Sequence, residues 1–216
     1  MMKAIFFGTV AIAVVFLSIY QETAHAQTTS TSPSDTVETE WRKVDDLCLT
    51  ALHKQINKEF DASIVYLKFA AHFAQEKVNL PGFENFFFKA AGEEREHGIK
   101  LIEYALMRGQ EPVSNTTFKL DYSFKVPSDT DGLSALNAAL KKEEDVTRSI
   151  RGVIKDCEQG SNDYHLVDYL TGEYLDEQHK GQRELAEKIA TLYKMVNTKG
   201  PNSPKLAEFL FDKQHM

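Results

Sequence analysis

Residues 81–109 read PGFENFFFKAAGEEREHGIKLIEYALMRG, and the pattern of this stretch predicts how the chain folds. Steps of three and four residues select one face of a helix. The residues on that face are Phe83, Phe87, Ala90, Glu94, His97, Leu101 and Tyr104. Pro81 before them and Gly109 after them are typical of helix boundaries. The stretch therefore predicts a helix over residues 82–108 whose inward face is apolar except for one acid and one histidine.

Three other stretches have the same period. The first predicts a helix over residues 43–72, with an inward stripe of Leu52, Ile56, Glu59, Ser63, Tyr66, Ala70 and Phe73. The other two stripes are Leu133, Leu136, Leu140, Glu143, Thr147, Ile150, Ile154 and Cys157, and Leu170, Tyr174, Gln178, Gly181, Leu185, Ile189, Leu192 and Val196. After Gly200-Pro201, Ser203 and Pro204 open a short amphipathic helix, Leu206 to Lys213. These patterns predict an all-α fold, a four-helix bundle with a short fifth helix.

The link between the second and third helices is long. From Gly109 to Ser128 it has about 20 residues, including Pro112 and Pro127. Such a link spans about 60 Å when extended, whereas a 27-residue helix is about 40 Å long. The link can therefore cross the whole bundle and make the second and third helices parallel, as in bundles with one long crossover.

The N-terminal residues resemble an export signal. Lys3 is followed by an apolar run from Ala4 to Tyr20 and then by Ala24-His25-Ala26, the small-x-small pattern of a cleavable signal peptide. An uncleaved membrane anchor is the alternative, but the run is shorter than the roughly 20 residues that span a bilayer. We expect a signal peptide over residues 1–26, a flexible Ser/Thr-rich extension over residues 27–40, and one domain over residues 41–216. The protein is then expected in the secretory pathway or outside the cell.

The charge and the cysteine count exclude several classes of function. The formal net charge is −7, and removing residues 1–26, which hold one lysine and one glutamate, leaves it unchanged. An acidic chain argues against nucleic acid as a partner and favours cations. Two cysteines are too few for a Cys-type zinc or iron–sulfur site.

Polar residues interrupt the apolar stripe of every long helix. They are Glu59 on the first, Glu94 and His97 on the second, Glu143 on the third and Gln178 on the fourth. Buried carboxylates are costly unless they are paired or bind a cation, so their convergence in one bundle core indicates a metal. Glu94 and His97 form the Glu-x-x-His element of di-iron carboxylate bundles. Oxygen and imidazole ligands suit iron.

The expected site is asymmetric. A second Glu-x-x-His is missing from the fourth helix, where Asp176-Glu177-Gln178-His179 places a neutral amide on the stripe. One half of the site would have Glu59, Glu94 and His97 as ligands, and the other half Glu94 or Glu143 with Gln178. A weak second half lets iron leave after oxidation, so we interpret iron as the substrate.

The alternative for each residue is a structural role. A single Glu-x-x-His occurs often by chance, Glu94 and His97 can lie on a solvated face, and Tyr66 and Gln178 are each common as satisfied core residues. The coincidence on four stripes favours the metal site over these alternatives. The other histidines, including His72 and His165, and Trp41 show no such convergence and are interpreted as structural.

At these residues the sequence resembles ferritin, and specifically the heavy-type, ferroxidase-competent subunit. The motifs that carry the resemblance are Ile56-Asn57-Lys58-Glu59 with Ala62-Ser63-Ile64-Val65-Tyr66-Leu67, Glu93-Glu94-Arg95-Glu96-His97, Tyr174-Leu175-Asp176-Glu177-Gln178, and Leu206-Ala207-Glu208-Phe209-Leu210-Phe211-Asp212-Lys213. The resemblance implies a ferroxidase centre of Glu59, Tyr66, Glu94, His97, Glu143 and Gln178 that binds two irons. It also implies a 24-subunit shell that stores mineralised iron, with nucleation carboxylates at Glu93 and Glu96.

Some positions depart from the family pattern. The resemblance places a threefold iron channel at Asp168, but Thr171 stands where a second acid is usual and Ile154 where a histidine is usual. The fourfold channel positions are the poorly ion-binding Leu206, Leu210 and Gln214. The export signal and two cysteines resemble those of secreted insect ferritins, which implies a mixed shell with a light-type chain and iron entry through that partner.

Three other functions would require a different sequence. A light-type ferritin subunit, which nucleates mineral without oxidising iron, would lack ferroxidase ligands. A secreted helical signalling protein would have leucines in place of the inward acids. A di-iron oxygenase or peroxide reductase would have the second Glu-x-x-His.

Two modifications are expected in an exported chain. The antiparallel first and third helices bring Cys48, at the start of one, level with Cys157, at the end of the other, which predicts a disulfide within one chain. Free thiols or bridges between subunits are the alternatives. Asn115-Thr116-Thr117 in the crossover is the only acceptor triplet for N-glycosylation.

Overall fold

The structure is a computed structural model that describes residues 39–160, 162–198 and 204–216, and every regular element in them is helical. The elements are η1 (Glu40–Arg42), α1 (Asp46–Phe73), α2 (Pro81–Met107), α3 (Gly132–Gln159), α4 (Tyr164–Tyr169), the π-helix η2 (Leu170–Leu175), α5 (Asp176–Val196) and α6 (Pro204–His215). The expected signal peptide, residues 1–26, and the expected extension, except for residues 39 and 40, lie outside the described residues. None of the described helices is long and apolar enough to cross a membrane.

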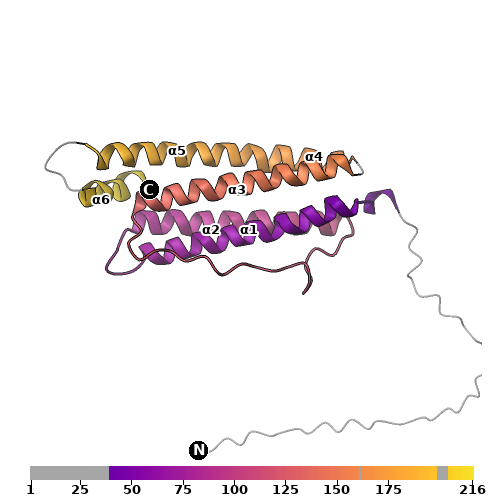
Figure 1. Cartoon of the computed structure of the whole chain (residues 1–216), viewed down its shortest axis with the longest axis horizontal. Coiled ribbons are helices and arrows are strands. Elements are labelled where there is room, and N and C mark those ends of the chain that lie inside the picture. Colours follow the sequence, from indigo (N-terminus) through magenta and orange to yellow (C-terminus); the bar gives the residue numbers. More distant parts are fainter. Residues whose placement is uncertain (1–38, 161, 199–203) are drawn as a thin grey trace, which may run out of the picture. The chain divides into compact units, whose positions relative to one another are not determined.

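The long helices form a four-helix bundle (Figure 1), as the sequence predicts. Helix α1 packs against α2 and α3, and α3 packs against α5. The segment between α2 and α3 runs along the bundle from one end to the other, so that these two helices have the same direction. The side chain of Asn57 on α1 holds this crossover by donating to the carbonyl of Thr117 (2.7 Å) and accepting from the amide of Lys119 (2.9 Å).

Two apolar clusters fill the bundle, one toward each end. The first surrounds Cys48, Leu52, Leu101, Ile150 and Leu166. The second is rich in phenylalanines whose rings contact one another, namely Phe69, Phe73, Phe83, Phe87 and Phe211. The inward acids, the histidine and the glutamine of the predicted site are buried as well, although they belong to neither apolar cluster.

The fourth helix differs from its prediction. It starts at Tyr164, earlier than the stripe suggests, and its α-helical pattern is interrupted by the π turn from Leu170 to Leu175. A π turn adds a residue per hydrogen-bonded ring and shifts the inward face. Gly181, predicted to face inward, is exposed and borders an opening in the surface instead.

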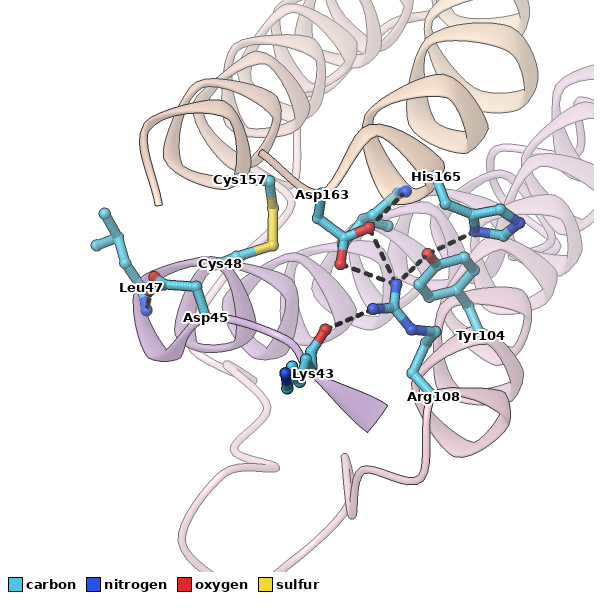
Figure 2. Close-up of a disulfide and its surroundings, with 10 residues drawn as sticks. Lys43, Asp45, Leu47, Cys48, Tyr104, Arg108, Cys157, Asp163 and His165 are labelled. Carbon is cyan, nitrogen blue, oxygen red and sulfur yellow. Dashed lines mark hydrogen bonds and ion pairs between the residues drawn. A yellow bond between two sulfur atoms is a disulfide. The ribbon is translucent and has the colours of Figure 1, made fainter. Parts of the chain in front are cut away.

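The disulfide between Cys48 and Cys157 is present (Figure 2), which confirms the predicted pairing. Both residues are fully buried, and their Cα atoms lie 4.4 Å apart. The bridge joins the start of α1 to the end of α3, as the antiparallel arrangement of these helices requires.

Helix α6 supplies acceptors to the starts of two other helices. The N-cap residue of α2, Leu80, has no side chain that can accept a hydrogen bond, and Asp212 Oδ1 accepts from the amide of Phe83 instead (2.9 Å). Glu208 Oε1 accepts from the amide of Gly132 at the start of α3. Helices α2 and α6 pack so closely that a Cβ on Gly82 would clash with the carbonyl oxygen of Asp212. Donors at a helix start that would be unsatisfied are therefore satisfied from a distant part of the chain.

We expect Asp212→Ala to lower the free energy of unfolding by about 1–2 kcal/mol, because it removes the acceptor for a buried amide. Asp212→Asn keeps an acceptor oxygen at the same place and should lower the free energy of unfolding clearly less. Denaturant midpoints of the assembled protein measure both losses. Equal losses in the two variants would show that the hydrogen bond to Phe83 is not what Asp212 contributes.

Candidate metal centre

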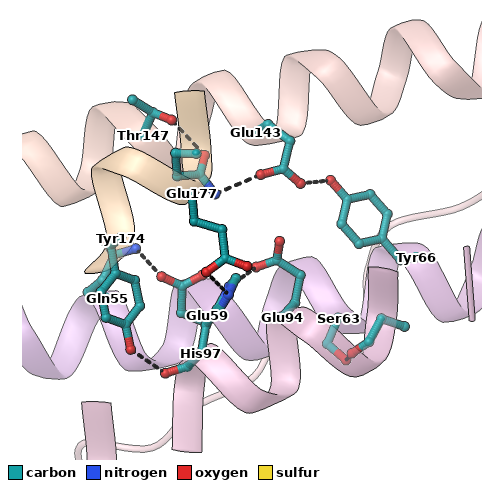
Figure 3. Close-up of polar contacts among 12 residues, drawn as sticks. Gln55, Glu59, Ser63, Tyr66, Glu94, His97, Glu143, Thr147, Tyr174 and Glu177 are labelled. Carbon is teal, nitrogen blue, oxygen red and sulfur yellow. Dashed lines mark hydrogen bonds and ion pairs between the residues drawn. The ribbon is translucent and has the colours of Figure 1, made fainter. Parts of the chain in front are cut away.

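Three predicted ligands lie together in the middle of the bundle. Glu59 comes from α1, and Glu94 and His97 come from successive turns of one face of α2. Each offers a ligand atom within 4.8 Å of the other two, and all three residues are buried. Figure 3 shows the side chains pointing toward one another. Among the described residues, no other group of three such side chains meets so closely.

The two carboxylates of this group are buried where the charged form is disfavoured. Burial, and next to it the neighbouring Glu94, raise the pKa of the Glu59 carboxyl well above its ordinary value. Burial and the nearby Glu143 raise the pKa of Glu94 in the same way. Glu59 Oε2 and Glu94 Oε2 are buried with no hydrogen-bond donor. A cation would relieve this repulsion by displacing protons from the acids, and these oxygens are the ligands it would use.

The other predicted residues form a second polar group beside the first. Glu143 on α3 accepts a hydrogen bond from the hydroxyl of Tyr66 and another from Gln178 Nε2 (2.8 Å). Burial and the charge of Glu143 raise the pKa of Tyr66 well above its ordinary value, so that the phenol stays a donor. Gln178 turns its oxygen to the hydroxyl of Thr147 (2.6 Å). The structure thus brings all six predicted residues together, in two groups that meet at Glu94 and Glu143.

Three residues outside the predicted set also support the site. Gln55 donates to Glu59 Oε1 (2.8 Å), and Tyr174 donates to the carbonyl of His97 (2.8 Å). Glu177 reaches from α5 to His97 Nε2 at 3.2 Å. Gln55 had a signal in the sequence, because it precedes Glu59 by four residues and so shares its helical face. Glu177 is the neighbour of Gln178 on α5 but stands off the predicted inward stripe, so the periodicity gave no signal for it.

An opening leads from the centre to the surface between α2 and α5. Its lining includes Glu94, His97 and Glu143 from the centre and the acids Glu93, Glu177 and Glu184 nearer the surface. Lys89 pairs with Glu93 at 3.0 Å. Cations would meet carboxylates both near the surface and at the inner end of this opening. Glu96, the other expected nucleation residue, is exposed on α2 but is not part of the lining.

The residues expected at channels and at the glycosylation site lie mainly on the surface. Asp168 and Thr171 are exposed, and Ile154 is half-buried. Leu206, Leu210 and Gln214 are exposed on α6, and Asn115 is exposed on the crossover.

Comparison with known proteins identifies the family. The family model for ferritin, described as a ferritin-like domain, matches residues 49–195. The chain belongs to the ferritin family. Members of this family bind iron, and their subunits assemble into oligomeric shells. The resemblance and the fold class expected from the sequence are both confirmed.

Several relatives of this ferritin are heavy chains from insects. The chain is 69% identical to the ferritin heavy chain of Aedes aegypti over 216 residues, which is 100% of each chain. It is 50% identical to the ferritin heavy chain of Drosophila melanogaster over 182 residues, 81% of this chain and 83% of that one. The crystal structure of Trichoplusia ni secreted ferritin superposes with a TM-score of 0.76 at 44% identity, covering 86% of this chain and 96% of the other.

Proposed function

We propose that this ferritin chain is a heavy-type subunit that oxidises ferrous iron with dioxygen and passes the ferric product to a mineral store. The observation that carries the proposal is the buried group of Glu59, Glu94 and His97, in which one oxygen of each carboxylate has no hydrogen-bond donor. Two ferrous ions are the substrate, and each gives one electron to dioxygen. With two protons the products are two ferric ions and hydrogen peroxide.

The ligand roles follow from the positions. Glu59 and His97 would bind the first iron, Glu143 with Gln178 the second, and Glu94 lies between the two groups and would bridge them. Gln178 must turn its amide oxygen away from Thr147 to reach a metal. That cost supports a second site weaker than the first, which lets the ferric ion leave.

The neighbouring side chains would position these ligands. Tyr66 orients Glu143, Gln55 orients Glu59, and Glu177 holds the ring nitrogen of His97 that faces away from Glu94. Outer partners of this kind fix the ring orientation and the tautomer of a ligating histidine. The acidic opening between α2 and α5 would be the path for iron, and Glu93 and Glu96 would nucleate mineral.

We further propose that the subunit is exported and forms a 24-subunit shell together with a light-type chain. The signal-like N-terminus, the disulfide and the similarity to a secreted ferritin support export. Asn115, which is exposed on the crossover, would then be a glycosylation site. Asp168 is the only acid at the expected threefold channel, because Thr171 and Ile154 replace the acid and the histidine that the family pattern has there. Such a channel would attract cations weakly, and this supports iron entry through the partner chain. A purely light-type role has no support, since all six residues of the expected centre are present and converge.

Anaerobic titration followed by exposure to air tests the proposed activity. We expect the purified protein to bind two ferrous ions per heavy-type subunit, the second more weakly than the first, and then to consume one dioxygen for two irons in a rapid phase. Optical absorbance and an oxygen electrode follow the two events. Iron oxidation no faster than in buffer would overturn the ferroxidase assignment, even if mineral still formed in the shell.

A further inference from the structure

A row of aromatic rings leads away from the metal centre along one end of the bundle. The ring centroids of His97 and Tyr174 lie 5.6 Å apart, those of Tyr174 and Tyr169 5.7 Å, and those of Tyr169 and Tyr104 5.0 Å. The row ends at His165, whose ring stacks on Tyr104 at 5.6 Å. Each ring is thus in contact with the next, and such contacts let an electron pass in short steps.

The π turn is what places two of these rings together. Tyr169 and Tyr174 are five residues apart, and in a regular α-helix they would point about 140° away from each other. The wider turn of η2, from Leu170 to Leu175, brings positions five apart onto nearly the same face. Turns of this type are frequent at functional sites. The irregularity therefore serves the aromatic row and does not merely interrupt a helix.

The far end of the row has a proton acceptor, as Figure 2 shows. The hydroxyl of Tyr104 lies 2.9 Å from His165 Nδ1, and Arg108 donates to the same oxygen at 3.0 Å. Arg108 can only donate, so the hydrogen of Tyr104 is free to point to His165, whose Nδ1 accepts it in the tautomer protonated at Nε2. Tyr104 is 5% exposed, whereas His165 is open to solvent in a groove that Trp41 and Met107 also line. A proton given to His165 can therefore reach water while the phenol stays shielded.

The tyrosines nearer to the centre differ from Tyr104 in their partners. Tyr174 donates to the backbone carbonyl of His97, which is not a base, so Tyr174 can relay an electron but cannot release its proton there. Tyr66 donates to Glu143, which is itself one of the expected ligands. Only Tyr104 in the row combines a shielded phenol with an imidazole in hydrogen-bond contact.

We propose that Tyr104 is a redox-active tyrosine that supplies an electron to the iron centre through Tyr169 and Tyr174 and gives its proton to His165. The proposal rests on the proposed ferroxidase function, which supplies hydrogen peroxide as the oxidant. A single ferrous ion gives peroxide only one electron, which produces a hydroxyl radical. A second electron from Tyr104 reduces it to water.

The step balances. Hydrogen peroxide takes one electron from a ferrous ion and one from Tyr104, and two protons from solvent complete two water molecules. The phenolic proton of Tyr104 moves to His165 Nδ1. The products are a ferric ion, a neutral tyrosyl radical, a protonated His165 and two waters. The radical is thereby held at the bundle end, away from the iron.

Electron paramagnetic resonance on freeze-quenched samples tests this inference. The assembled protein, loaded anaerobically with one ferrous ion per heavy-type subunit, is mixed with hydrogen peroxide. We expect a radical signal that narrows when the protein contains ring-deuterated tyrosine, and loss of most of that signal in Tyr104→Phe, which keeps the ring stack and removes only the hydroxyl. His165→Gln should also lose the signal, because the amide cannot take the proton.

Tyr122→Phe is the matched control, because Tyr122 is an exposed tyrosine on the crossover and this variant should keep the full signal. A signal that persists in Tyr104→Phe would overturn the proposal and place the radical on another tyrosine. Oxidation by dioxygen is followed separately in wild-type protein loaded with two ferrous ions per heavy-type subunit. Rapid oxidation without any radical overturns this inference alone, whereas the absence of both overturns the proposed function as well.

Discussion

Replacing either Glu94 or His97 with alanine is expected to slow the rapid phase of ferrous oxidation by roughly 100-fold or more. Loss of an outer partner of a metal ligand already costs about 10–100-fold in affinity or activity, and these two residues are expected to be ligands themselves. Glu94 should give the larger effect, since it lies between the two polar groups and would serve both irons. The initial rate of dioxygen consumption after anaerobic loading measures the change.

Matched controls separate this effect from a general loss of charge or structure. Glu103→Ala removes an exposed acid from the same helix, and His179→Ala removes an exposed histidine from α5, so both should oxidise iron as the wild type does. All variants should still assemble, which size-exclusion chromatography checks. Wild-type rates in the Glu94 and His97 variants would remove these residues from the centre, and the ferroxidase proposal with them.

Removing the disulfide is expected to lower the free energy of unfolding by about 4–5 kcal/mol in the loop-entropy model. The bridge closes a loop with a sequence separation of 109 residues, so it greatly restricts the unfolded chain. For a domain of this size the loss corresponds to a fall in melting temperature of roughly 10–15 °C. The double variant Cys48→Ala/Cys157→Ala, compared with the wild type by calorimetry, measures it.

Reduction of the wild-type protein provides the control for side-chain effects. Because both sulfurs are fully buried, alanine also leaves small cavities, whereas a reductant breaks the bridge without changing the packing groups. The reduced wild type should melt close to the double variant. If neither reduction nor substitution shifts the melting temperature, the bridge is not formed in the mature protein or does not constrain its unfolding.

The helices and the core of the centre could be predicted from the sequence because they depend on local periodicity. A residue such as Glu59 or Glu94 stands at a fixed angle on its helix, so an acid on an apolar stripe must enter the core. The crossover followed from its length alone. The pairing of Cys48 with Cys157 followed from helix direction, since it needs only the ends of two helices to be level.

The parts that could not be predicted depend on contacts between distant segments. The π turn has no periodic signal, because its extra residue is stabilised by packing against other helices. The contact of Tyr169 with Tyr174 follows from that turn. The contact of His165 with Tyr104 had no periodic signal either, because the two residues are 61 apart in sequence.

The two acceptors on α6 have a consequence for the order in which the protein forms. Asp212 and Glu208 accept hydrogen bonds from backbone amides at the starts of α2 and α3. Both acidic residues are synthesised long after those helices. A nascent chain that stops short of residue 208 therefore lacks one acceptor at the start of each of these two helices, although Asp131 still caps α3 by accepting from the amide of Ser134. The starts of both helices therefore gain their last acceptors only when the end of the chain has emerged from the ribosome.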